Sequence, residues 1–201
     1  TKYQELQKNA ESIGGHLIDH ANLKEALADI RFPVYFLDFE TVSESIPRFD
    51  KVGPFQQIPF QASVHRMSNR HSKLKHFSFL DIEGEDPRRP LALFLLKVLG
   101  EEGTIIAYHA SFERSRLYEL IKIIPSSEKR ILSLIDRIWD LEEIFSKGIL
   151  INKNFHGSTS IKKVLPVMCP ELSYDDLEIK NGALASIEYL RMIHSDTSPE
   201  I

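Results

Sequence analysis

The run VYFLDFETV, residues 34–42, constrains the fold of this chain more than any other segment. It consists almost entirely of β-branched, aromatic and aliphatic residues, which is typical of a strand buried in a sheet. Successive side chains of a strand point to opposite faces, so Asp38 and Glu40 are predicted to share one face while the apolar residues between them take the other. The chain therefore has to place two neighbouring carboxylates on a core strand.

Such an acidic pair can be stabilised in two ways. Removing ionised carboxylates from water costs several kcal/mol each unless positive charge compensates them, and like charges this close also repel. A divalent cation such as Mg²⁺ or Mn²⁺, which prefers carboxylate oxygen, would supply that compensation. Alternatively, the pair lies at a strand end, either solvated or paired with lysine or arginine. The D-x-E spacing alone leaves both possibilities open.

The first part of the chain predicts a helical arm followed by the start of a sheet. Residues 3–30 are polar and helix-prone, with Asn22 as a candidate cap, so an N-terminal helical arm is predicted over residues 1–31. A single further domain is expected over residues 32–195. After the strand at 34–42, two more strand-like segments suggest an antiparallel meander. These segments are QASVHRMS at 61–68 and KHFSFLDI at 75–82.

The second part alternates helix and strand. The predicted elements are a helix over 91–99, a buried strand over 104–109, a helix over 112–124 capped by Ser111, a helix over 127–145 in which IWDL could include a short strand, a short helix over 160–168 and a last helix over 182–193. Together these signals predict an α/β fold with a mixed β-sheet, an antiparallel meander followed by parallel strands, flanked by α-helices.

Composition and charge narrow the function classes. The net charge of −4 argues against binding nucleic acid by overall charge, although local basic patches such as residues 70–76 remain available. No apolar run approaches the roughly 18 residues that cross a bilayer, so no membrane partner is expected. One cysteine, Cys169, and the absence of a leader pattern predict a cytoplasmic protein. The histidines show no zinc-ligand spacing, and no P-loop or serine-hydrolase elbow occurs.

A second acidic position follows a later strand. In AYHASFERSRL, residues 107–117, Glu113 falls in the first turn of a predicted helix. The helix dipole alone would stabilise an acid there. A strand-borne D-x-E together with an acid just past a later strand is also what a two-metal phosphodiester site needs.

These segments resemble a known superfamily. FLDFET resembles the first motif, and YHASFE the second motif, of the DnaQ-like (DEDD) 3′–5′ exonucleases, which have a ribonuclease-H-like fold. The chain is closer still to a bacterial branch of that superfamily, through segments spread over residues 32–193. These are IPFQASVH at 58–65, YHASFE at 108–113, GSTSIKKVLP at 157–166 and ELSYDDLEIKNG at 171–182.

The resemblance implies a site that holds two Mg²⁺ or Mn²⁺ ions. Asp38 would bridge both ions, Glu40 would bind one of them, and Glu113 would take the place of the second-motif aspartate. The family uses aspartate there, and glutamate reaches about one bond further. The ligand geometry would therefore differ from the family pattern.

The third motif departs further from the family. Where the superfamily has a general-base histidine and a fourth metal-binding aspartate, NGALAS has Asn181 and Ser186, which can supply neither function. Asp140 and Glu188 are the other candidates for the fourth carboxylate, although Glu188 is turned about 200° around the helix from Ser186.

The resemblance predicts a metal-dependent 3′–5′ exonuclease that acts on single-stranded DNA or RNA ends, as one domain of a longer protein or alone. Thr41, His109, Phe112 and Lys162 are the candidate nucleic-acid contacts, although core packing explains Phe112 and a solvated surface explains His109 and Lys162 equally. The altered third motif supports an alternative, a degenerate module that binds nucleic acid or a protein partner without cleavage. Neither the choice between DNA and RNA nor the oligomeric state follows from the sequence.

Overall fold

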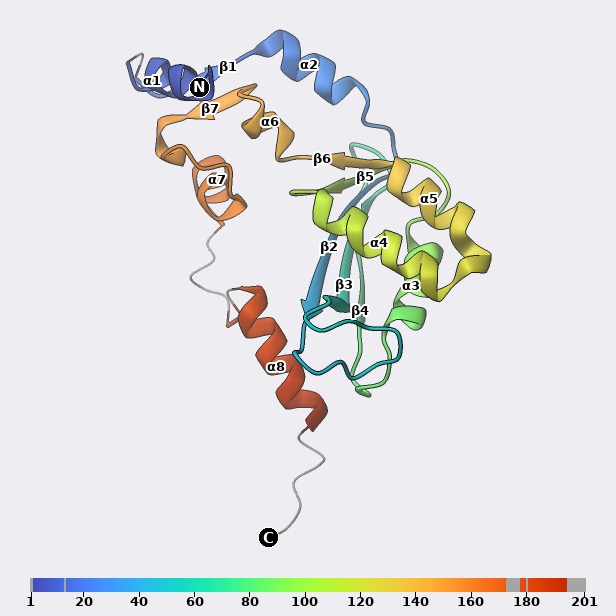
Figure 1. Ribbon diagram of the computed structural model, residues 1–201. Helices are drawn as coiled ribbons and strands as arrows, with labels where there is room; N and C mark the ends of the chain where they lie inside the picture. Colours follow the sequence, from blue (N-terminus) through green and yellow to red (C-terminus); the bar gives the residue numbers. More distant parts are fainter. Residues whose placement is uncertain (1, 13, 173–177, 180, 195–201) are drawn as a thin grey trace.

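The computed structural model describes residues 2–12, 14–172, 178–179 and 181–194 (Figure 1). Its central sheet has five strands: β2 (Val34–Val42), β3 (Ile58–Met67), β4 (Lys75–Leu80), β5 (Thr104–Ala107) and β6 (Ile138–Asp140). Their order across the sheet is β4-β3-β2-β5-β6, so the strand with the D-x-E pair lies in the middle. Parts of ELSYDDLEIK, residues 173–177 and 180, and the predicted domain end at 195 lie outside the described residues.

The strand pairing is mixed. β2, β3 and β4 form an antiparallel meander, as predicted, whereas β5 runs parallel to β2, and β6 runs parallel to β5. β2 pairs with β5 only over residues 34–36 and then continues beyond it. The edge of β2 that follows Phe36 is therefore open toward the chain that leaves β5.

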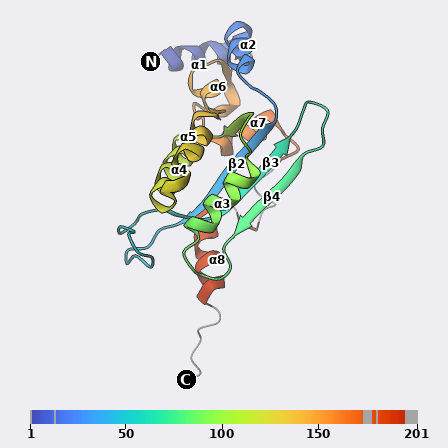
Figure 2. The ribbon, with the colours of Figure 1, turned by 90° about the vertical axis from the view of Figure 1, so that its right-hand side faces the viewer.

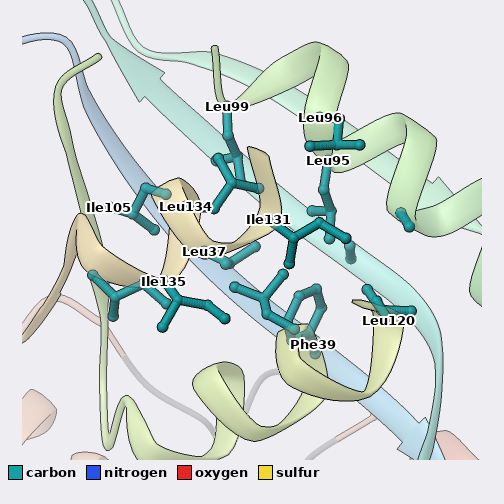
Figure 3. Close-up of a cluster of buried hydrophobic side chains, with 14 of the residues drawn as sticks. Leu37, Phe39, Leu95, Leu96, Leu99, Ile105, Leu120, Ile131, Leu134 and Ile135 are labelled. Carbon is teal, nitrogen blue, oxygen red and sulfur yellow. The ribbon is translucent and has the colours of Figure 1, made fainter. Parts of the chain in front are cut away.

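One face of the sheet carries the main apolar core. Three helices cover it: α3 (Arg88–Val98), α4 (Ser111–Ile123) and α5 (Glu128–Asp136). Figure 3 shows Leu37 and Phe39 of β2 packed among side chains such as Leu95, Leu120 and Leu134. Burying one such side chain contributes roughly 1.5–3 kcal/mol, so this face holds the sheet and the three helices together. The predicted mixed sheet flanked by helices is confirmed.

The N-terminal arm is helical only in part. Between α1 (Lys2–Ser12) and α2 (His20–Ala28), a short strand β1 (His16–Ile18) pairs antiparallel with β7 (Leu150–Asn152). The predicted cap Asn22 is wrong: Asp19 precedes α2, and its Oδ1 accepts a hydrogen bond from the amide of Asn22 at 3.1 Å. The helix begins at His20, which makes Asn22 its third residue and leaves Asp19, an equally good cap residue, to accept from the free amide.

The segment predicted as one helix over 127–145 contains the short strand that IWDL allowed. After α5, Arg137 donates hydrogen bonds to the carbonyls of Leu99, Gly100 and Gly103 at 2.7–2.8 Å, which fixes the end of the helix against the loop before β5. The chain then forms β6 and a short helix α6 (Glu143–Ser146). The predicted cap Ser111 is also wrong, because it is the first residue of α4 and Ala110 precedes it without a side-chain cap.

Two helices lie on the other side of the sheet, α7 (Ile161–Met168) and α8 (Gly182–His194) (Figures 1 and 2). α8 packs Ala185 and Tyr189 on Val42, Ile58 and Phe60. A register shift at Glu40 and Thr41 marks a β-bulge, which changes the alternation so that Phe60 faces α8. No helix in the described part of the chain is both long and apolar enough to span a bilayer.

Candidate functional site

The two faces of β2 differ as the D-x-E spacing predicts. Leu37 and Phe39 are buried in the core, whereas Asp38 is exposed and Glu40 half-buried on the opposite face. The prediction that the two acids share one face is confirmed. They lie in the part of β2 that extends past β5, where the parallel strands separate and ligand sites of α/β sheets usually occur.

Positive charge does not balance this pair. Within the described ranges, neither Asp38 nor Glu40 forms an ion pair, so the lysine or arginine partner that would otherwise account for them is not found. Desolvation raises the pKa of Asp38. Desolvation and the charge of Asp38 raise the pKa of Glu40, while Lys162 lowers it. The charge of Lys162 offsets this cost only at Glu40, and the pKa values of both carboxyl groups remain raised.

Glu113 adds a third acid to this region. It lies in the first turn of α4, only 3% exposed, and its Oε2 is buried without a hydrogen-bond partner among the described residues. Burial, together with the charges of Asp38 and Asp140, raises its pKa to about 7 against the opposing effects of a backbone hydrogen bond and His109. A buried carboxylate oxygen that lacks a donor costs roughly 1–3 kcal/mol, so Glu113 is held in an unfavourable state by the packing of α4.

Asp140 has a structural function that the sequence did not indicate. Its Oδ1 accepts from the amides of His109 and Glu142 at 3.0 Å each, and its Oδ2 accepts from the amide of Ala110 at 2.9 Å. These bonds stabilise the bend between β5 and α4, where His109 adopts a left-handed conformation with φ 64°. Asp140 thus holds the two residues that lead into α4, whose first turn has no side-chain cap. As a fourth metal ligand it would have to share oxygens already engaged by amides.

Two further residues beside the site were missed by sequence reasoning. Glu142 accepts a hydrogen bond from Thr159 Oγ1 at 2.6 Å, and its other oxygen lies 2.6 Å from His109 Nδ1. This bond raises the pKa of His109, and despite desolvation the bonds from Thr159 and His109 lower the pKa of Glu142. The only available signal was the possible strand in IWDL, because β6 is what brings Glu142 next to the end of β5.

The third-motif helix begins beside Glu40. A Cβ on Gly182 would lie 3.1 Å from Glu40 Oε2, so α8 starts in contact with the acidic face. Asn181 Oδ1 accepts from the amide of Leu184 at 3.0 Å and so caps α8. Ser186 Oγ donates to the carbonyl oxygens of Thr41 at 2.7 Å and Gly182 at 2.9 Å. The altered positions thus lie near the acids and serve the helix and its attachment to β2.

The remaining candidate residues differ in how they lie relative to the acids. Glu188 is exposed and pairs with Arg191 at 2.6 Å, away from the acids. Phe112 packs partly against the core, with the Arg116 guanidinium 5.2 Å from its ring centre. Lys162 is exposed on α7 and acts on Glu40 only through its charge. Asp38 therefore lies within electrostatic range of both Glu40 and Glu113.

A cavity of about 750 Å³ adjoins Asp38. Asp38, Phe36 and Ile106 line it from the sheet, and His109 and Glu142 line it from the neighbouring loops. A second cavity of about 480 Å³ shares His109. His109 thus lies where both spaces meet.

The donor set fits a hard divalent cation in chemistry but is not closed around one. Carboxylate oxygens are the preferred ligands of Mg²⁺ and Mn²⁺, and the orphaned Oε2 of Glu113 is available. However, the described residues contain no group of three or more His, Cys, Asp or Glu side chains already arranged to hold a metal ion. The site offers the ligands without a formed coordination sphere.

Comparison with known proteins identifies relatives of this chain. It is 31% identical over 170 residues to "Uncharacterized protein MG366 homolog" of Mycoplasma pneumoniae and 28% identical over 170 residues to "Uncharacterized protein MG366" of Mycoplasma genitalium, each time over 76% of this chain and 25% of the relative. It is 29% identical over 170 residues to "Uncharacterized protein UU173" of Ureaplasma parvum, over 74% of this chain and 24% of that protein. The chain thus spans about a quarter of the length of these relatives. No solved structure matches it.

A family model covers most of the sheet and includes all three candidate acids. The model described as "Domain of unknown function (DUF2779)" matches residues 35–160, a range that contains Asp38, Glu40 and Glu113 but ends before Asn181 and Ser186. The matched range is more than half of the chain, and it carries the D-x-E strand and the start of α4. The chain belongs to the DUF2779 family.

Proposed function

We propose that this chain is a ribonuclease-H-like, metal-dependent 3′–5′ exonuclease domain that hydrolyses phosphodiester bonds at single-stranded DNA or RNA ends in the cytoplasm. One observation carries the proposal: a buried, unpartnered carboxylate oxygen of Glu113 lies in the electrostatic range of Asp38, beside the opening where β2 extends past β5. An orphaned buried acid next to other acids is retained at a cost, and binding a cation would relieve that cost.

Asp38, Glu40 and Glu113 would hold the cations. Divalent ions bound there would lower the pKa of a water molecule and stabilise charge on the leaving 3′ oxygen. All three acids have pKa values raised above their ordinary range, so each must be ionised before it can bind a metal. Activity should therefore rise with pH through about 7, where Glu113 loses its proton.

The residues around the acids would bind the phosphate and the terminal nucleotide. Because Glu142 engages Nδ1 of His109, Nε2 is the nitrogen left for a phosphate oxygen or for water. The raised pKa of His109 favours its charged form, which suits anion binding better than general-base catalysis. Lys162 and Thr41 are the further contacts that the proposal includes. The cavity beside Asp38 would receive the base and sugar.

The third-motif helix favours a second candidate function. Asn181 caps α8 and Ser186 bonds to the carbonyl of Thr41, so neither provides a base or a metal ligand. A module that binds nucleic acid or a protein partner without cleaving it would tolerate these residues.

Incubation of the purified chain with a 5′-labelled single-stranded oligonucleotide separates the two functions. With Mn²⁺ an exonuclease produces a ladder of shortened products, and chelator stops it; a 3′-labelled copy releases labelled mononucleotide at once. Asp38→Asn should lower the rate by more than about 100-fold, the loss that outer-shell changes alone can reach at metal sites. Asp136→Asn, at an exposed position at the end of α5, is the matched control and should keep full activity. Retarded migration without shortening would favour the binding module.

A further inference from the structure

The β3–β4 hairpin has a charge opposite to that of the rest of the chain. Residues 51–80 contain no Asp or Glu, whereas all 29 acidic residues and 20 of the 25 Lys and Arg residues lie elsewhere. Within this range the hairpin concentrates cations and histidines over twelve positions. They are His65, Arg66, Arg70, His71, Lys73, Lys75 and His76. A chain with a net charge of −4 thus carries one strongly basic segment.

The cations of this hairpin are unpaired. Arg70, Lys73 and Lys75 are exposed, and they form no ion pair with any residue that the structure describes. Some cations elsewhere are paired, since Arg48 and Lys147 each bind an acid four residues away, whereas Lys24 and Lys129 form no ion pair with the described residues either. Positive charge on the hairpin is therefore free to act on a ligand.

The turn between the strands is held in one shape. Asn69 Oδ1 accepts from the amide of His71 at 2.9 Å, and Ser72 Oγ donates to the carbonyl oxygen of Asn69 at 2.8 Å. Figure 2 shows that this turn projects away from the helices. The turn is therefore already ordered by folding, so ligand binding does not carry the entropy cost of ordering it.

A row of polar side chains connects the hairpin to the acids. On the face that carries Asp38, the residue opposite it on β3 is Ser63, and the next one across on β4 is Ser78. Neighbouring strands are about 4.8 Å apart, so Ser78 lies about 10 Å from Asp38 across the sheet. Ser63 Oγ lies 3.0 Å from His76 Nε2, and the rings of His65 and His76 stack at 4.2 Å. These groups can all hydrogen-bond to an anion.

We infer that the β3–β4 hairpin binds the phosphodiester backbone of single-stranded nucleic acid and directs its end along the Ser78–Ser63 row to Asp38. The inference rests on the proposed function and adds to it a second contact region outside the acidic site. Three acids repel a polyanion. The basic turn, which begins five residues past Ser63 and so roughly 17 Å along β3 from the Ser78–Ser63 row, offsets that repulsion. The net charge of the chain would otherwise oppose association.

Neither edge protection nor membrane binding accounts for the basic hairpin as well. Lysines often protect the exposed edge of a sheet from pairing with another chain, and Lys75 on the edge strand β4 can do so. Arg70 and Lys73, however, lie in the turn, where no strand edge exists. An anionic membrane surface would call for an apolar face to insert, but Leu74 is the one large apolar side chain that is exposed in the turn as described.

The test compares two double variants with the same loss of charge. Arg70→Gln with Lys73→Gln removes two cations of the turn, and Lys24→Gln with Lys129→Gln removes two cations from α2 and α5. Binding of a labelled single-stranded oligonucleotide is measured by fluorescence anisotropy, in chelator and at several salt concentrations. The hairpin variant should bind about tenfold more weakly, and the slope of log K against log salt should fall by about 1.4, as expected for two lost contacts to a single strand.

Equal binding by the two double variants would overturn the inference, as would an absence of binding by the unchanged chain. A second experiment uses vesicles of phosphatidylserine. The inference is wrong, and the ligand is a lipid surface, if two results occur together: the vesicles bind the unchanged chain more tightly than the oligonucleotide does, and the hairpin variant loses that binding. Because the measurement is made in chelator, it does not depend on cleavage. A chain that binds through its hairpin but never shortens an oligonucleotide would refute the proposed enzyme and leave the hairpin contact intact.

Discussion

The two faces of β2 have the same backbone and opposite energetics. On one face Tyr35, Leu37 and Phe39 are at most 4% exposed and pack against three helices. On the other face, Asp38 and Glu40 lie with Glu113 nearby, and all three carboxyl groups have raised pKa values. The first face contributes to folding, and the second reduces stability.

This difference separates the residues that stabilise the fold from the acids that lower its stability. Packing on the apolar face is strong enough to hold uncompensated acids on the other, because the two sets of residues alternate along one strand. Conversely, folding does not account for the acids. Residues that a fold retains although they destabilise it are typically functional.

The largest effect should come from truncating the apolar face. Leu37→Ala should lower the free energy of unfolding by about 3 kcal/mol, because it leaves a cavity among α3, α4 and α5. Phe36→Ala is the matched control one residue earlier, on the partly open face, and should cost about 1 kcal/mol. Urea denaturation followed by circular dichroism measures both, and equal losses would mean that the two faces do not differ as described.

The free energy of unfolding of the protein should rise when an acidic charge near this face is removed. Glu113 has a folded pKa of about 7, above its ordinary value of 4.5, so the folded state binds its proton more tightly than the unfolded state does. In chelator, the stability that this proton contributes is therefore fully present below pH 4.5 and is lost as pH rises toward 7. Glu113→Gln should raise the free energy of unfolding at pH 8 by about 2 kcal/mol and flatten this dependence.

An exposed loop residue provides the control for this substitution. Glu101→Gln removes the same charge near the end of α3 and should leave the pH dependence unchanged. Denaturation midpoints at about pH 5 and pH 8, on either side of the folded pKa of Glu113, distinguish the two variants. A Glu113→Gln variant that is less stable than the parent at the higher pH would mean that the carboxylate has a stabilising partner.

A smaller effect is expected where α8 closes the open face. Tyr189 donates a hydrogen bond to Asp81 Oδ2 at 2.6 Å, both side chains being buried, and its ring stacks on Phe60 at 4.0 Å. Tyr189→Phe keeps the stacking and removes the hydrogen bond, so it should cost about 1 kcal/mol. In this variant, amide hydrogen exchange should show that α8 opens faster than α4. If neither the free energy of unfolding nor the exchange of α8 differs from the unchanged chain, apolar contacts alone hold α8.

How much of this could be predicted from the sequence depended on the range of the interactions. The alternation in VYFLDFETV specified the two faces of β2, and turn signals around β3 and β4 specified the meander, because both patterns are local. The caps were wrong at Asn22 and Ser111, since α2 begins three residues earlier, after Asp19, and the bend before α4 is held by Asp140 from a different strand. Local propensity cannot reveal such a distant partner.

The site shows the same limit. The D-x-E strand and Glu113 were found by pattern, and in the structure Asp38 lies within electrostatic range of Glu113. Glu142 and Thr159 were missed, because they approach His109 only through the short strand β6 and the loop before α7. The unpartnered state of Glu113 Oε2 also follows from packing and not from any local signal.

Anomalous diffraction from a crystal equilibrated with Mn²⁺ would show whether the acidic face of β2 binds metal. We expect a peak between the carboxylates of Asp38, Glu40 and Glu113, with Glu113 Oε2 turned toward the ion. Its absence at saturating Mn²⁺, while the three side chains are well ordered, would contradict a metal-dependent site on this face of β2.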